Sequence, residues 1–193
     1  QVIDMAEKTI GKLELALDAR AALAETPVWD ERQQLLYWVD IEGCAIHCLN
    51  PADGTDRSYV LNQRVGSVAL RERGGLIAAL QHGFYQIDYE NQSCTAIADP
   101  EADLPDNRFN DGKCDPAGRF WAGTMGMSKP RQPAGALYLL HPDHRIEQKV
   151  TGVKTSNGLA WSLDQRTLYY IDTACQSVDA FDYDQQTGAI ANR

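Results

Sequence analysis

Four polar residues are spaced so that they could share one site. Glu25, Asn110 and Asn157 stand at the starts of units that repeat along the chain, and Arg108 lies two positions before Asn110. Carboxylate and amide oxygens suit a hard or borderline divalent cation such as Ca²⁺, Mg²⁺, Mn²⁺ or Zn²⁺. In an extended segment Arg108 and Asn110 would face the same way, and together they could hold hydroxyl and carbonyl oxygens of a small polar ligand.

Each of these residues also has an ordinary structural explanation. Asn110-Asp-Gly and Ser156-Asn-Gly both have the composition of tight turns, so the spacing leaves turn residue and ligand equally open for the two asparagines. Glu25 could be an exposed strand end, and a surface position is the commoner one for a single arginine. Motifs such as G-x-S-x-G and H-E-x-x-H are absent from the sequence, which disfavours covalent serine and zinc–histidine chemistry.

An internal repeat could bring the four residues together. Val28–Asp40 and Ala160–Asp172 are near copies 132 positions apart, and weaker copies lie between them. The unit starts are Glu25, Gly66, Asn110 and Asn157. Their spacings of 41, 44 and 47 residues are typical of a β-propeller, in which each repeat forms one four-stranded blade and the innermost strands line a central channel. The alternative is a β-sandwich in which two strands are alike by accident.

The length bounds the number of blades. We expect one β-propeller domain over residues 1–193, and at about 45 residues per blade it would hold about four blades, either as a four-bladed ring or as part of a larger one. Alternating leucines predict an additional N-terminal strand over residues 12–18. The tryptophans that recur with the repeat are interpreted as packing between blades; they are Trp29, Trp38, Trp121 and Trp161.

Composition narrows the classes of partner and the compartment. A net charge of −9, with the 18 Lys and Arg residues scattered, argues against binding to nucleic acid. The sequence has no apolar run long enough to span a membrane. Five cysteines without a Cys-x-x-Cys pair predict neither a disulfide framework nor a zinc knuckle, and they indicate a reducing compartment, the cytoplasm. The sequence carries no signal for an oligomeric state.

Several motifs, in order along the chain from about residue 13, resemble the SMP-30/gluconolactonase family. They are Ala24–Trp29, Asn107–Lys113, Asp115–Met125, Ser156-Asn-Gly158, Tyr170-Ile-Asp172 and Val178–Tyr183. The resemblance implies an all-β, six-bladed β-propeller, of which about four blades are present here. It also implies one divalent cation at the channel mouth and an enzyme that hydrolyses a small sugar lactone.

Residue by residue, the resemblance implies that Glu25 and Asn157 bind the metal and that Arg108 and Asn110 bind the substrate. The third metal ligand of the family, an Asp that is also its proposed general base, is expected beyond Arg193. We therefore expect this chain alone to bind metal weakly and to have little or no lactonase activity. The alternative function is a non-catalytic propeller that binds a cation or a protein partner.

One departure from the family pattern concerns the substrate. Some members carry a Glu just after the Gly-Thr-Met motif as a substrate contact, whereas Gly126-Met-Ser-Lys129 follows here. The animal-type substrate contact is therefore missing. A sugar lactonase of the bacterial type is the nearer expectation.

Overall fold

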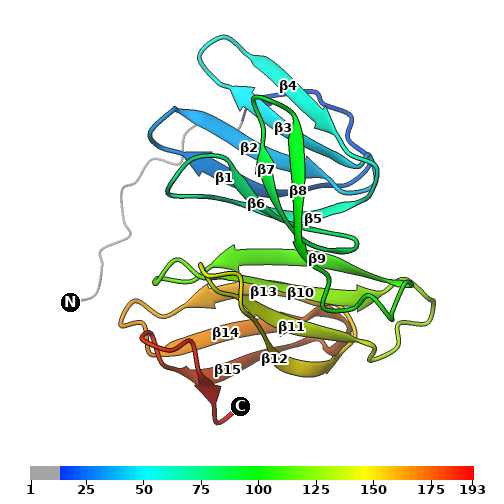
Figure 1. The fold of residues 1–193 in the computed structure, drawn as a ribbon, viewed down its shortest axis with the longest axis vertical. Helices are drawn as coiled ribbons and strands as arrows, with labels where there is room; N and C mark the ends of the chain where they lie inside the picture. The colour runs from blue at the N-terminus through cyan, green and yellow to red at the C-terminus, as the bar shows by residue number, and fades with distance from the viewer. Residues whose placement is uncertain (1–13) are drawn as a thin grey trace.

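Antiparallel strands build almost the whole of the chain that the computed structural model describes, residues 14–193 (Figure 1). Sixteen strands in these residues form four four-stranded sheets, which we call blades 1 to 4. Blade 1 contains β1 (Ala24–Asp30), β2 (Leu35–Asp40), β3 (Ala45–Asn50) and β4 (Thr55–Val60). Blade 2 contains β5 (Val65–Leu70), β6 (Leu76–Leu80), β7 (Gly83–Asp88) and β8 (Ser93–Ala98).

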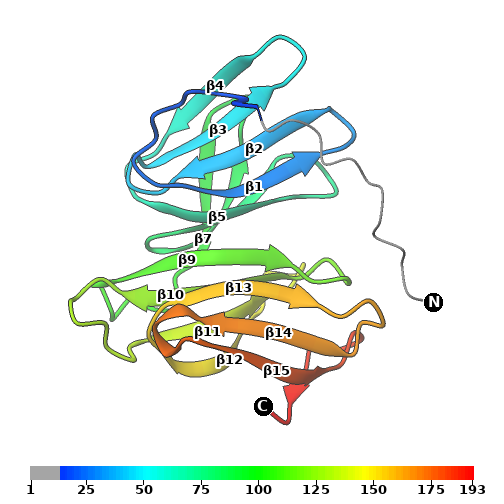
Figure 2. The ribbon, with the colours of Figure 1, turned by 180° about the vertical axis from the view of Figure 1, so that it is seen from behind.

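The second half of the chain repeats this plan. Blade 3 contains β9 (Asn107–Cys114), β10 (Phe120–Gly126), β11 (Gly135–Leu140) and β12 (Ile146–Val153). Blade 4 contains β13 (Ser156–Trp161), β14 (Thr167–Asp172), β15 (Ser177–Tyr183) and β16 (Ile190–Ala191). Strands are paired in chain order within every blade, as in Figure 2, so each blade is a simple meander.

Adjacent blades pack through the first strand of each. β5 lies beside β1 and β9, and β9 lies beside β13. The four blades thus have the arrangement of a β-propeller, which confirms the predicted fold class and the predicted number of about four blades. The two near copies in the sequence are the first hairpins of blades 1 and 4, because each spans the turn between the first and second strands.

The predicted N-terminal strand is wrong where it can be compared. Residues 14–18 form no strand, and Leu15 is 80% exposed; residues 12 and 13 lie outside the described part. A strand needs a partner whose backbone completes its hydrogen bonds. Alternating leucines supply the pattern of a strand but not that partner.

An apolar cluster fills each interface between neighbouring blades. One cluster joins blades 1 and 2, a second joins blades 2 and 3, and a third joins blades 3 and 4. Fully buried members include Ile46 and Leu80 in the first, Phe84 and Phe109 in the second, and Trp121 and Tyr170 in the third. The core is therefore divided among the blade interfaces, so each blade is stabilised by its neighbours.

The recurring tryptophans do not share one role. Trp121 and Trp161 pack edge-on against each other and against Tyr183, at the interface of blades 3 and 4, as predicted. Trp38 instead stacks on a histidine of its own blade, and Trp29 is 45% exposed. The described residues thus show aromatic packing between blades for Trp121 and Trp161, but not for Trp29 and Trp38.

A carboxylate at the end of the second strand holds the backbone that leads into blades 1 and 4. Asp40 accepts hydrogen bonds from the backbone N–H groups of residues 22 and 23, each at 2.9 Å. Asp172 accepts the equivalent bonds from residues 154 and 155, also at 2.9 Å. The repeat in sequence is therefore also a repeat of hydrogen bonds.

A buried ion pair joins blades 3 and 4 near the end of β9. Arg119 Nε donates to Asp115 Oδ2 at 2.7 Å, and its Nη2 donates to the Tyr183 hydroxyl at 2.8 Å and to the Gln185 carbonyl at 2.7 Å. Tyr183 in turn donates to Asp115 Oδ2 at 2.8 Å, and Trp121 Nε1 donates to the same oxygen at 3.0 Å. Every group of this network has a partner, so its burial is compensated.

Helix is nearly absent from residues 14–193. One short 3₁₀ helix, Thr173–Cys175, follows β14. Across these residues we find no helix with the length and apolar character needed to cross a membrane. The five cysteines are all free thiols.

Candidate metal and substrate site at the channel mouth

The innermost strands share a local irregularity near the unit starts. Strand pairing shifts by one residue between Glu25 and Val28, between Val65 and Ser67, and between Asn157 and Leu159. β9 shifts in the same way where residues 110 and 111 face a single residue of β10. A β-bulge of this kind redirects side chains from the regular alternation. Glu25 and Asn157 are the last paired residues before their bulges, whereas Gly66 and Asn110 lie within theirs. The positions that the sequence spacing relates therefore correspond to within one residue.

A series of contacts connects these positions from blade to blade. Thr26 Oγ1 donates to the Gly66 carbonyl at 3.4 Å, and Asn110 Nδ2 donates to the Ser156 carbonyl at 2.7 Å. Between them β5 and β9 approach so closely that a Cβ at Gly66 would lie 2.6 Å from the carbonyl oxygens of Phe109 and Asn110. Only glycine allows this approach. The bulges thus form one continuous row across the four inner strands.

Arg108 and Asn110 lie together, as the sequence predicts. Arg108 Nη1 donates to Asn110 Oδ1 at 2.8 Å and to the Phe109 carbonyl at 2.9 Å. Because Asn110 also donates to blade 4, its amide is fixed at both ends. In the described chain Arg108 Nε and Nη2 donate to no protein group, so these N–H donors remain for a ligand.

The charge of Arg108 is poorly compensated. Arg108 is only 7% exposed, and no carboxylate of residues 14–193 forms an ion pair with it. Burial lowers the pKa of its guanidinium, and the charges of Arg131 and Arg64 lower it further, whereas Glu42 and Glu25 partly oppose this. A buried cation without an adjacent anion is unfavourable. A ligand with negative charge would relieve this situation.

Glu25 and Asn157 offer oxygen atoms near the row of bulges. Glu25 is exposed, and no group of the described chain donates to its carboxylate. Asn157 is held by two hydrogen bonds at 3.0 Å, one from its Nδ2 to Thr173 Oγ1 and one from the Gly158 N–H to its Oδ1. The structure shows no contact between Glu25 and Asn157 in residues 14–193. The two residues therefore offer oxygen atoms from separate inner strands and do not contact each other.

The two asparagines are not hairpin-turn residues. Asn110 lies in β9 and Asn157 lies in β13, each beside a bulge. Bulges and tight turns use similar residues because both need unusual backbone angles, and Gly158 has a φ of +27°. The turn explanation is therefore wrong for both residues.

Asp111 is a residue that the sequence reasoning missed. It is half-buried beside Asn110, and burial raises the pKa of its carboxyl, against the opposing effects of the Gly112 N–H, the Lys113 charge and the Gly158 N–H. The effect of the Gly158 N–H on this pKa indicates that the carboxylate lies near β13, which contacts β9. The signal that could have found Asp111 is its position in the repeat, directly after a unit start.

The donor set fits a hard divalent cation in kind but is incomplete in number. Glu25, Asn157 and Asp111 supply carboxylate and amide oxygens, which Ca²⁺ and Mg²⁺ prefer. Residues 14–193 contain no group of three or more His, Cys, Asp or Glu side chains that could hold a metal ion. These residues are therefore candidate cation ligands that do not form a complete site by themselves.

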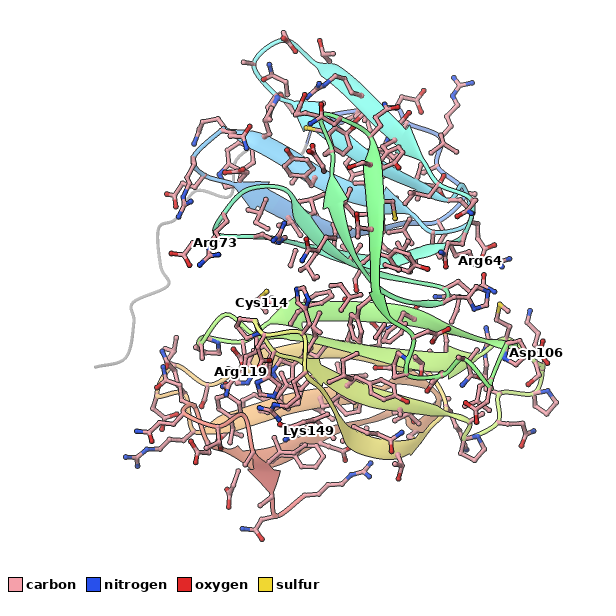
Figure 3. All side chains as sticks on the ribbon, in the orientation of Figure 1. Arg64, Arg73, Asp106, Cys114, Arg119 and Lys149 are labelled. Atoms are coloured by element: carbon pink, nitrogen blue, oxygen red, sulfur yellow. The ribbon has the colours of Figure 1, made fainter. Side chains whose placement is uncertain are left out.

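Figure 3 shows which end of the molecule carries this site. Asp106, which directly precedes β9, lies at the same end as Arg64, which directly precedes β5. Cys114, the last residue of β9, lies toward the opposite end with Arg119. The candidate residues thus belong to the end where the inner strands begin, and the buried ion pair belongs to the other.

Comparisons with known proteins agree with this architecture. Residues 23–193 match the profile described as the SMP-30/Gluconolactonase/LRE-like region. Regucalcin of Xenopus laevis is 43% identical over 188 residues, a match that covers 94% of this chain and 62% of the relative. The chain thus spans less than two thirds of the length of the curated relatives it matches.

Two solved structures share the fold closely. A luciferin-regenerating enzyme is 31% identical, with a TM-score of 0.83 over 89% of this chain and 59% of that protein. A protein described as the calcium-binding protein regucalcin, from Agrobacterium tumefaciens, is 26% identical, with a TM-score of 0.84 over 90% of this chain and 58% of that protein. Both matches include all four blades, because the coverage extends over nearly all described residues.

Proposed function

This chain belongs to the SMP-30/gluconolactonase/LRE-like family, and from this membership we propose that the protein hydrolyses a sugar lactone with one divalent cation. The observation that carries the proposal is the fixed pair of Arg108 and Asn110 beside the oxygen donors of neighbouring strands. The pair offers unused N–H donors at a point where a polar ring could be held. The bulges direct the surrounding side chains to the same place.

The residues of this chain would mainly bind and orient. Glu25 and Asn157 would hold the cation, with the Asp111 carboxylate near the second of them. The cation, when bound, polarises a carbonyl group and stabilises the negative charge that develops on its oxygen. Arg108 would donate to an oxygen of the sugar, and Asn110 would keep the guanidinium in place. Orientation of this kind lowers the entropic part of the barrier.

Hydrolysis also requires a proton acceptor. Water adds to the acyl carbon, the ring C–O bond breaks, and the product is a hydroxy acid. The water proton must pass to a carboxylate or other base within reach. The family resemblance suggests an Asp beyond Arg193 for this role. We therefore expect the 193-residue chain to have little or no activity.

A second candidate function is cation binding without catalysis. It is supported by the name of the relative from Agrobacterium tumefaciens, which is described as a calcium-binding protein. Oxygen donors alone would suffice for this function, and Arg108 would then have no substrate to hold. Chelation of the cation would lower the stability of the protein under either function, but it would abolish hydrolysis only if the protein is a lactonase.

We also propose the cytoplasm as the compartment and a small sugar lactone as the partner. Free thiols at all five cysteines are compatible with a reducing environment.

A hydrolysis assay tests the proposed function. Acid release from gluconolactone would be followed with and without a chelator, for this chain and for a form extended past Arg193. We expect chelator-sensitive activity in the longer form, reduced at least about tenfold by Glu25→Gln or Asn157→Ala. Asn91→Ala, an exposed asparagine of blade 2, is the matched control.

Three results would contradict parts of this proposal. Unchanged activity of both site variants would place the site elsewhere. Metal-dependent ring opening by the 193-residue chain, well above the spontaneous rate, would show that the chain needs no further carboxylate. A longer form that binds the cation but opens no lactone would favour the second candidate function.

A further inference from the structure

Three arginines gather at the end of the molecule where the inner strands begin. Arg64 directly precedes β5, Arg108 is the second residue of β9, and Arg131 lies between β10 and β11. Arg64 and Arg131 both act electrostatically on Arg108. Arg108 is buried and the other two are half-buried, so none is simply a solvated surface charge.

Two of these three arginines form no ion pair in the described part of the chain. Arg64 pairs with Glu42 at 2.9 Å. Arg131 Nη1 donates only to the carbonyl oxygens of Gly126 and Ser128, at 2.5 and 3.4 Å. Arg108 donates to a carbonyl and to an amide. In the described part of the chain, one ion-paired carboxylate therefore serves three guanidinium groups.

Arg108 and Arg131 have no ion-paired carboxylate in the described residues, although the chain has a net charge of −9. Glu42 and Glu25 act on Arg108 only through space. The segment after Thr124-Met125 adds no carboxylate, because its residues are Gly126-Met-Ser-Lys129. Its carbonyl groups instead hold Arg131 in place. Guanidinium groups that lack a carboxylate partner can donate to the oxygens of an anionic ligand.

We propose that this mouth selects lactones that carry an anionic substituent, a carboxylate or a phosphate, bound by Arg131 and Arg108 with a contribution from Arg64. The proposal rests on the proposed lactonase function, since it specifies the substrate of the same site. The planar guanidinium of arginine matches the paired oxygens of both groups. An uncharged lactone would leave the buried charge of Arg108 without compensation.

Matched ligands can test this by binding alone. Galactonolactone is neutral, galactarolactone carries a carboxylate in place of its terminal hydroxymethyl group, and phosphogalactonolactone carries a phosphate there. Calorimetric titration of the chain with each ligand, in the presence of Ca²⁺, needs no turnover. We expect at least one anionic ligand to bind about tenfold more tightly than the neutral one. Comparison of the two anionic ligands shows whether the site prefers a carboxylate or a phosphate.

Variants assign the preference to the arginines. Arg131→Gln should reduce the affinity for the preferred anion about tenfold and leave the neutral lactone unaffected. Arg64→Gln provides a second variant if the first does not fold. Arg145→Gln, an exposed arginine between β11 and β12, is the control and should retain the preference. Higher salt should weaken the preference, because half-buried charges are partly screened.

The outcomes separate this proposal from the lactonase function. Equal affinity for neutral and anionic lactones would overturn it, as would a preference that survives both arginine variants. An anionic lactone that binds preferentially, but that even the form extended past Arg193 does not hydrolyse, would support the binding preference and contradict the proposed hydrolysis. Hydrolysis of all three lactones at equal kcat/KM would do the reverse.

Discussion

β9 has a buried arginine near its start and another just after its end, and the two are bonded in opposite ways. Arg119 is 5% exposed and Arg108 is 7% exposed. Arg119 has the carboxylate of Asp115 at 2.7 Å and further partners on blade 4. Arg108 has a carbonyl and an amide but no carboxylate in the described chain. The difference is therefore in pairing and not in burial.

The carboxylates near these arginines differ in the same direction. Burial raises the pKa of Asp111 in the middle of the strand, beside Asn110. Burial alone would also raise the pKa of Asp115, but bonds from Trp121, the Arg119 backbone N–H, Tyr183 and the Arg119 side chain lower it below its ordinary range. One end of β9 is thus optimised for stability. The other retains unpaired charge, as is common where a protein binds ligands.

The largest effect on stability should come from removing the Asp115 carboxylate, which pairs with Arg119. Asp115→Ala leaves Arg119 buried without its anion and removes acceptors for Trp121 and Tyr183, so we expect a loss of about 3–5 kcal/mol in the free energy of unfolding. Urea denaturation followed by tryptophan fluorescence would measure it. Asp106→Ala, an exposed aspartate at the other end of β9, is the control. A loss below about 1 kcal/mol, the size expected of a surface change, would contradict the comparison.

The two arginines provide the most direct contrast. Arg119→Gln should lower the free energy of unfolding by about 2–3 kcal/mol, because it leaves the Asp115 carboxylate with a weaker neutral donor. Arg108→Gln should lower it by less than about 1 kcal/mol, because no carboxylate loses its partner. Urea titrations of both variants under the same conditions measure the difference. Similar losses would show that burial rather than pairing decides the cost.

Replacement of the Asp111 carboxylate should change the stability in the opposite direction from replacement of Asp115. Asp111→Asn removes a charge that burial disfavours, so we expect the free energy of unfolding at neutral pH to rise by about 1 kcal/mol. Calorimetric titration with Ca²⁺ should at the same time show weaker binding, since an amide replaces a carboxylate. Asp106→Asn serves as the matched change at an exposed site. A decrease in stability would mean that Asp111 is a structural residue like Asp115.

The smallest effect should appear in the pH dependence. The folded-state pKa of Asp115 lies below its ordinary value of 3.8, so its ionised form stabilises the fold above about pH 4. This contribution is lost as the pH falls through the folded-state pKa. The free energy of unfolding should therefore fall more steeply below pH 4 in the unaltered chain than in Asp115→Asn, by about 1 kcal/mol. Parallel curves from urea titrations at a series of pH values would argue against it.

The repeat made much of this arrangement predictable from sequence. Four units with matching turns predict four blades, and the unit spacing predicts the places of Asn110 and Asn157 at the bulges of the inner strands to within one residue. This works because a blade is a local meander, so its register depends on neighbouring residues. Arg108 and Asn110 were predictable as a pair for the same reason, since they are two positions apart in one strand.

The remaining features depend on contacts between distant segments. Tyr183 completes the pair of Asp115 and Arg119 from more than 60 positions away, and the sequence gives no sign of this. Asp111 was missed because Asn-Asp-Gly is as typical of a turn as of a bulge. The N-terminal strand was wrong because the alternation of Leu15 and its neighbours says nothing about a pairing partner.

The aspartates that end β2 and β14 suggest how such a chain can grow. Asp40 and Asp172 each hold the connection into the blade that contains them, through bonds to backbone N–H groups. The entry to each of these blades is therefore defined within the blade itself and does not depend on the side chains of the preceding one. A gene segment that encodes such a blade can be duplicated and inserted while keeping its own entry geometry. Propellers with different numbers of blades can then arise from one ancestral unit.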